Sequence, residues 1–203
     1  MSFEIKEPAV AYTFPGTMEE FLSYVETQED RYEFYKGEVM LMAGSTKGHS
    51  IITFNIHSKL KGIFKPKGCM TFQESVYLRI QKENTLFLPD AVVTCQPEDF
   101  SLKTLYLEHP SIIVEVLSPS TELHDRSGKW QQYRQIPSLR YYLMVSQKEP
   151  LVEVYGRPHA QSLFFFESFE GIEATVDLRE MGLNIPMQEI YDGIVFETTA
   201  ELP

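Results

Sequence analysis

The hydrophobic residues of this chain recur at two spacings, one typical of helices and the other of strands. A helix is expected over about 48–64, where apolar side chains repeat every four positions: Ile52, Ile56, Leu60 and Phe64. A shorter helix is expected to begin at Thr17, because Glu20 three residues later completes a capping box, and to end near Val25. A polar segment over about 123–135 predicts a third helix.

Shorter runs of apolar and aromatic residues indicate strands. Residues 32–35 and 38–42 flank the dipeptide Lys36-Gly37 and predict a β-hairpin. Residues 111–117 read Ser-Ile-Ile-Val-Glu-Val-Leu, an almost wholly apolar run that is typical of a central strand covered on both faces. Further elements are expected as strands over 69–80, 85–95, 140–145, 151–155, 162–168 and 174–176, and as a short helix over about 187–192.

The order of these elements favours an α/β fold. From about residue 45 to 156 the expected order is helix, three strands, helix and strand, which predicts a central mixed β-sheet flanked by helices. The hairpin precedes this core, and a β-rich extension follows it. A length of 203 residues fits a single domain over 1–203.

Composition narrows the class of protein. No stretch approaches the roughly 18 apolar residues that span a bilayer, and the N-terminus lacks the basic and apolar pattern of a secretory signal. Cys69 and Cys95 stand on separate apolar-rich segments, outside any C-x-x-C pair and away from histidines at ligand spacing. We interpret them as two buried thiols of a cytoplasmic protein.

The net charge of −11 is unfavourable for binding nucleic acid, but it is unevenly spread. From Glu167 to the end there are nine acidic residues and a single base, Arg179, so this tail carries most of the excess. Lysines cluster elsewhere, at Lys59, Lys61, Lys65 and Lys67. The cluster is either a solvated helix end or a patch that contacts a phosphate backbone. If DNA binds, we expect it to avoid the C-terminal forty residues.

Two acidic residues lie where the pattern predicts strands. Asp90 follows Pro89 and precedes Ala-Val-Val, and Glu115 lies within the apolar run 111–117. A buried charge is costly unless it has a partner. Two carboxylates on neighbouring strands suggest a shared Mg²⁺, which prefers oxygen ligands and activates a bound water for attack on a phosphoester. The spacing leaves a buried ion pair with Lys or Arg equally open.

A third group lies on the polar helix that follows Glu115. Asp125, Lys129 and Tyr133 are spaced by four, so they share a face that can fold back over the sheet. Lys129 would there stabilise charge on phosphoryl oxygens. The alternative is a surface salt bridge between Asp125 and Lys129.

Several of these segments together form a recognisable pattern. They are Leu88-Pro89-Asp90, the run Ile113 to Thr121 (Ile-Val-Glu-Val-Leu-Ser-Pro-Ser-Thr), Asp125-Arg126, Lys129 and Tyr133, preceded by Tyr32-Glu33, Gly37-Glu38 and His49. The pattern resembles the Uma-two family, restriction endonuclease-like bacterial proteins of the PD-(D/E)xK nuclease superfamily. The match covers about Thr17 to Tyr155, and its most specific part is Glu-Val-Leu-Ser-Pro-Ser-Thr with the Asp and Lys that follow.

The resemblance implies a restriction-endonuclease-like sandwich in which Asp90 and Glu115 bind a catalytic Mg²⁺ or Mn²⁺, with the carbonyl of Val116 as a further ligand. The superfamily pattern places a lysine two residues after the glutamate, where this chain has Leu117. Lys129 is therefore the candidate for a lysine that has moved to the helix.

Two further residues of the pattern have two interpretations each. Glu33 either adds an acid near the metal or forms an ion pair in the hairpin. His49 either assists the attacking water or serves the structure, as a helix cap or through a hydrogen bond in the core.

We therefore expect a metal-dependent endonuclease that hydrolyses phosphodiester bonds of DNA, with Asp90, Glu115 and Lys129 as catalytic residues. A homodimer would suit double-strand cleavage, by analogy with the fold alone. The alternative is a nuclease-fold binding or assembly module without catalysis, which the acidity favours, and a hydrolase of small phosphoesters is a third option. Nothing resembles a Gly-rich phosphate loop, a Ser–His–Asp set or a cysteine nucleophile, and no organic cofactor is expected.

Overall fold

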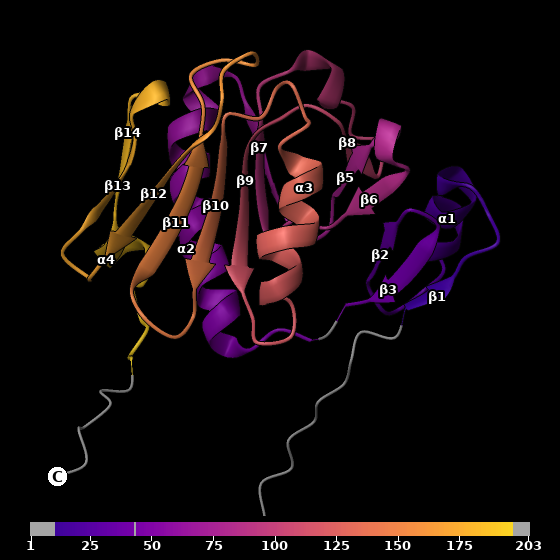
Figure 1. Ribbon diagram of the computed structural model, residues 1–203, viewed down its shortest axis with the longest axis horizontal. Coiled ribbons are helices and arrows are strands. Elements are labelled where there is room, and N and C mark those ends of the chain that lie inside the picture. Colours follow the sequence, from indigo (N-terminus) through magenta and orange to yellow (C-terminus); the bar gives the residue numbers. More distant parts are fainter. Residues whose placement is uncertain (1–10, 43, 197–203) are drawn as a thin grey trace, which may run out of the picture.

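The computed structural model describes residues 11–42 and 44–196, and its centre is a mixed six-stranded sheet (Figure 1). In spatial order the sheet contains β12 (Phe165–Glu170), β11 (Leu151–Gly156), β10 (Tyr141–Ser146), β9 (Pro110–Leu117), β7 (Ala91–Thr94) and β4 (Met70–Gln73). The β9–β10 pair is parallel and the other pairs are antiparallel. The prediction of an α/β fold with a mixed sheet is therefore confirmed.

The centre of this sheet is β9, whose residues are all buried. Its side chains alternate between two cores. Ile112, Val114 and Val116 pack towards α2 (Lys47–Phe64). Ile113 and Leu117 face the opposite side, which α3 (Trp130–Tyr133) covers (Figure 1). The C-terminal elements add to the α2 side of the core: β13 (Thr175–Leu178), β14 (Leu183–Pro186) and α4 (Met187–Ile190). Of these three, β14 was not predicted.

A second six-stranded sheet lies beside the first and contains the predicted hairpin. In spatial order its strands are β1 (Ala11–Thr13), β3 (Glu38–Leu41), β2 (Tyr32–Tyr35), β6 (Thr85–Phe87), β5 (Tyr77–Ile80) and β8 (Tyr106–Leu107). Positive φ angles at Lys36 (53°) and Gly37 (92°) form the two-residue turn that suits a hairpin. The hairpin is thus part of a larger N-terminal sheet.

The predicted helices α1 (Met18–Val25) and α2 both begin at a threonine cap. Thr17 and Glu20 form the complete capping box, and Thr46 accepts from the backbone N–H of His49. The predicted polar helix differs, because its first part, His124–Lys129, is a π-helix that α3 continues. Short 3-10 helices occupy Lys65–Lys67, Gln81–Glu83, Pro97–Asp99 and Arg179–Met181.

The segments 69–80 and 85–95, each predicted as one strand, are two strands each and cross between the sheets. The first leaves the central sheet at Glu74, which adopts a left-handed φ of 46°. The second passes from β6 to β7 through Leu88, Pro89 and Asp90. The N–H of Glu74 donates to the carbonyl of Pro89 at 3.2 Å, so the two crossings touch. The sheets therefore meet where Glu74 and Asp90 lie.

The prediction of two separate thiols is wrong, because Cys69 and Cys95 form a disulfide. Cys69 immediately precedes β4 and Cys95 immediately follows β7, and the register Met70↔Thr94 places the cysteines opposite each other on antiparallel strands. Pairing depends on this register, which the isolated sequence does not reveal. Among the described residues, no helix is long and apolar enough to cross a membrane.

Two glycines in the fold give opposite predictions for substitution by alanine. At Gly156, a Cβ atom would lie 2.4 Å from Phe165 Cζ and 2.6 Å from Tyr141 Cε1, whereas at Gly62 of α2 it would meet nothing within 4 Å. We expect Gly156→Ala to lower the unfolding free energy by about 1–3 kcal/mol through overpacking. Gly62→Ala should raise it by about 0.5–1 kcal/mol.

Urea denaturation of both variants measures these changes. A Gly156→Ala protein as stable as the wild type would contradict the close packing of β11 against β12.

Candidate metal and catalytic site

Glu115 is a buried carboxylate in the middle of the central sheet. It is 3% exposed, and the alternation along β9 points it to the α3 side. Two groups hold its Oε1 atom: Lys129 Nζ at 3.0 Å and the Tyr133 hydroxyl, which donates at 2.7 Å. The predicted face of Lys129 and Tyr133 therefore folds back over Glu115.

The Lys129 ammonium lies among three carboxylates. Besides Glu115, it contacts Glu33 Oε1 at 3.0 Å and Asp125 Oδ1 at 3.3 Å, and all four side chains are almost fully buried. Glu33 Oε1 also accepts from the backbone N–H of Leu88 at 2.9 Å, which ties the N-terminal sheet to the segment before Asp90. Glu33 is thus part of the site, and the predicted Asp125–Lys129 pair is buried rather than on the surface.

The π-helix at His124–Lys129 positions two of these charged residues. Its six residues are wound more widely than an α-helix, a form that recurs at functional sites. Gly128 lies against the His124 ring, where a Cβ atom would be 2.7 Å from Nδ1. The sequence spacing of four predicted the shared face correctly but not this wide turn.

Asp90 belongs to a second group of polar side chains at the junction of the sheets. Its Oδ2 accepts from the backbone N–H of Val116 at 2.6 Å and lies 3.2 Å from His49 Nε2. The other ring nitrogen of His49, Nδ1, is buried, has no hydrogen-bond partner within the part of the chain that the structure describes, and lies 4.0 Å from Glu74 Oε1. The His49 side chain therefore contacts Asp90, and the residue that caps the helix is Thr46.

Sequence reasoning missed Glu74, and the reason is local. Glu74 interrupts the apolar segment 69–80 as part of the polar triplet Gln-Glu-Ser, which is the signal that the segment is not one strand. Arg31 donates to Glu74 Oε2 at 3.1 Å and remains partly exposed. Arg31 was likewise not predicted.

The donor atoms at this junction suit a divalent cation. One ligand atom from each of His49, Glu74 and Asp90 lies within 4.8 Å of the others. The contacts of Asp90 use Oδ2 and those of Glu115 use Oε1, which leaves Asp90 Oδ1 and Glu115 Oε2 for another ligand. Carboxylate oxygens with one imidazole fit Mg²⁺ or Mn²⁺, and the partnerless Nδ1 of His49 is a further donor.

Burial and neighbouring charges act in opposite directions on the groups of the site. Burial raises the pKa of Glu115 well above its usual range, Lys129 opposes this, and Asp125, Asp90 and Glu33 reinforce it. Burial alone would lower the pKa of Lys129, but the surrounding carboxylates raise it well above normal, so the ammonium stays charged. The pKa of His49 is also raised, because Asp90 and Glu74 outweigh its burial.

The carboxylates around Lys129 predict a pH-dependent loss of stability in Lys129→Met. Removing the ammonium leaves buried acids without a cation, which costs about 3–5 kcal/mol near neutral pH. An acid whose pKa is higher in the folded than in the unfolded protein favours folding at low pH. We therefore expect the loss to shrink between pH 7.5 and 5.5 as Glu115 is protonated.

Urea denaturation at both pH values tests this, with Lys59→Met as the matched control. Lys59 pairs with Glu189 at the surface, so its loss should change stability by about 1 kcal/mol or less at either pH. An equal loss in Lys129→Met at both pH values would show that unpaired carboxylates are not its cause.

Comparison with known proteins agrees with this architecture. The model of the Uma2 family, described as "Putative restriction endonuclease", matches residues 18–188. The Synechocystis sp. protein slr1290 is 29% identical over 88% of this chain and 92% of that protein, and sll1609 from the same organism is 32% identical over 73% and 84%. A crystal structure from Anabaena variabilis, described as "a putative nuclease belonging to DUF820", is similar with a TM-score of 0.70, at 19% identity over 87% of this chain and 98% of that one. This chain therefore belongs to the Uma2 (Uma-two) family, and it shares the fold of the Anabaena variabilis protein.

Proposed function

We propose that the protein is an endonuclease that hydrolyses phosphodiester bonds of DNA with the help of Mg²⁺ or Mn²⁺. The observation that carries this proposal is that Asp90, the residue before β7, comes opposite Glu115 of the adjacent strand β9, with the Lys129 ammonium in contact with Glu115. The N–H of Val116 donates to Asp90, so the backbone next to Glu115 holds the Asp90 carboxylate in place. Membership of the family supports a nuclease activity.

The metal would be held by Asp90, Glu115 and the carbonyl of Val116. When bound, it supplies Lewis-acid polarisation of the phosphoryl group and a lower pKa for an attacking water. His49 orients Asp90 through Nε2, and Glu74 lies on the far side of the same ring. These two residues extend the site beyond the pair of acids.

Lys129 would stabilise negative charge on the phosphoryl oxygens. Its charge is secured by the surrounding carboxylates, and burial strengthens its interaction with any anion that reaches it. Glu33, Asp125 and Tyr133 are positioning residues in this scheme, because they contact Lys129 or Glu115. In this proposal, Lys129 supplies the positive charge that the motif lysine would supply in place of Leu117.

The DNA would approach from the side of the N-terminal sheet. The acidic C-terminal elements begin at β12, which is the edge of the central sheet farthest from β4. Two basic residues lie near the proposed site. Arg31 contacts Glu74, and Lys47 begins α2 two residues before His49. The lysine cluster begins at Lys59, about 15 Å along α2 from His49 at a rise of about 1.5 Å per residue, and continues away from the site. We therefore assign phosphate contacts to Arg31 and Lys47 rather than to the cluster.

A homodimer in the cytoplasm completes the proposal. Two copies would present two sites to the two strands of a duplex, which suits double-strand cleavage. Sedimentation at micromolar concentration with and without duplex DNA would test the dimer.

We predict that Asp90→Asn and Glu115→Gln each lower the Mn²⁺-dependent cleavage of plasmid DNA by at least about a hundredfold. Either change removes a negatively charged ligand from the metal, which would then no longer be held where it polarises the phosphoryl group and activates the water. Glu98→Gln is the matched control, because Glu98 is an exposed acid outside the site, and it should retain full activity. Activity of Asp90→Asn equal to that of the wild type would exclude the proposed site.

Metal binding separates this function from a catalytically silent module. Isothermal titration of the wild type with Mn²⁺ should show a site that Asp90→Asn lacks, at a temperature where both proteins are folded. If the wild type binds neither Mn²⁺ nor Mg²⁺, the fold serves binding or assembly instead.

A further inference from the structure

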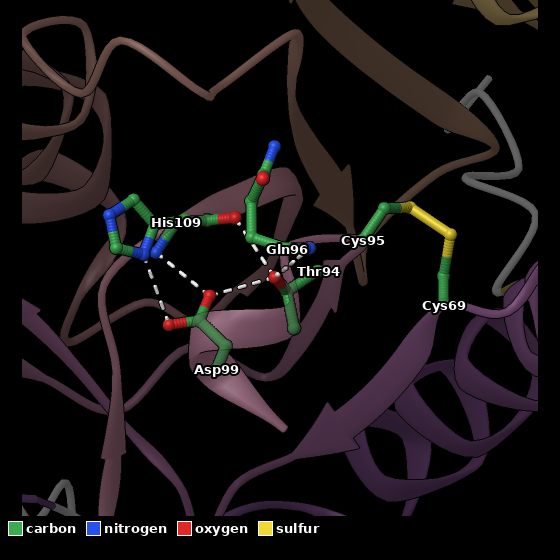
Figure 2. Close-up of a disulfide and its surroundings, with 6 residues drawn as sticks. All are labelled: Cys69, Thr94, Cys95, Gln96, Asp99 and His109. Atoms are coloured by element: carbon green, nitrogen blue, oxygen red, sulfur yellow. Dashed lines mark hydrogen bonds and ion pairs between the residues drawn. A yellow bond between two sulfur atoms is a disulfide. The ribbon is translucent and has the colours of Figure 1, made fainter. Parts of the chain in front are cut away.

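The Cys69–Cys95 disulfide joins an edge strand to the interior of the central sheet. Among the described strands, β4 pairs with β7 alone, over the four residues Met70–Gln73. Figure 2 shows the disulfide at one end of this pair, where Cys69 precedes β4 and Cys95 follows β7. The bond is therefore the covalent tie between β4 and its neighbour.

The other end of the same strand pair carries the candidate metal site. Gln73 is opposite Ala91, so the next residue of β4, Glu74, comes beside Asp90. Glu74 is held there by its N–H to Pro89 and by its contacts with Arg31 and His49. A change in the pairing of β4 with β7 thus changes the position of Glu74 relative to Asp90.

The two ends of the disulfide are supported unequally. On the Cys95 side, Asp99 accepts from the Thr94 hydroxyl at 2.7 Å and from the backbone N–H of His109 at 3.0 Å (Figure 2). It also accepts from the backbone N–H of Glu108 at 2.9 Å. Asp99 is 7% exposed, and its hydrogen bonds hold the end of β7 against the segment that precedes β9. On the Cys69 side, the N–H of Cys69 donates to the carbonyl of Phe64 at 3.1 Å and β4 packs on α2, while no strand within the described residues pairs with the other edge of β4. Opening the disulfide would therefore remove the covalent tie at this end of β4 and loosen β4 more than β7.

We propose that Cys69 and Cys95 form a reversible disulfide that positions Glu74 against Asp90 and His49, so that its reduction weakens divalent-metal binding. A dithiol reductant supplies the two electrons and two protons: each protein sulfur becomes a thiol, and the two thiols of the reductant close to a disulfide. Both cysteines are partly exposed, which gives such a reductant access. In reducing compartments, disulfides are typically transient and redox-sensing.

This inference rests on the proposed metal site but is tested by two independent measurements. The first is hydrogen exchange of the full chain without metal, before and after reduction with dithiothreitol. Reduction should speed exchange at least threefold in peptides covering 70–75 and leave those covering 99–109 unchanged. The second is the Kd for Mn²⁺, which reduction should raise at least threefold.

Variants separate the disulfide from other effects of the reductant. The double variant Cys69→Ser, Cys95→Ser should behave like the reduced wild type with and without dithiothreitol. Glu74→Gln should bind Mn²⁺ more weakly and lose its response to reduction, whereas Glu98→Gln should respond like the wild type. Free-thiol titration of the untreated protein should find none until it is reduced.

Each contrary result has a definite meaning. Two free thiols in protein exposed to oxidised glutathione, or unchanged exchange over 70–75, would overturn the disulfide clamp. Faster exchange with an unchanged Kd would overturn its link to the site. If Mn²⁺ binds to neither form, the proposed function fails, and the exchange result still decides whether the disulfide holds β4.

Discussion

The buried ammonium of Lys129 is the charge on which the site depends. It neutralises carboxylates from three parts of the fold, namely Glu33 of the N-terminal sheet, Glu115 of the central sheet and Asp125 of the π-helix. Burying these acids without a cation would cost several kcal/mol each. Lys129 therefore allows acidic side chains from two sheets and a helix to pack together in the interior.

In the proposed function, the same residue has a structural and a chemical role. Three acids around one ammonium leave an excess of negative charge, and burial raises the pKa of Glu115. A divalent cation beside Asp90 and Glu115 would relieve that excess and favour ionised Glu115, so metal binding and proton release are linked. Substrate phosphate would then meet Lys129 in a site whose charge is already balanced.

The parts predicted from the sequence are those set by local pattern. The capping box at Thr17, the helix at 48–64 and the buried strand around Glu115 follow from periodicity and were confirmed. The spacing of Asp125, Lys129 and Tyr133 placed them on one face, although the π-helical turn was not foreseen. A spacing of four residues fits an ordinary α-helix, so it gives no sign of a π-helical turn.

The parts that were missed depend on contacts between distant segments. Glu74 approaches His49 because two strands cross between sheets, and the crossings were hidden in apolar segments that each resembled one strand. The disulfide likewise follows from the register of β4 on β7. A shift of one residue in that register would turn the cysteines away from each other.

The most direct test of the central claim is a crystal structure of the protein soaked with Mn²⁺, with the metal located by anomalous scattering. The account predicts a Mn²⁺ ion that contacts both Asp90 and Glu115, with the Lys129 ammonium directed towards the same space. A Mn²⁺ ion held by His49 and Glu74 without Glu115, or no ion at Asp90, would contradict it.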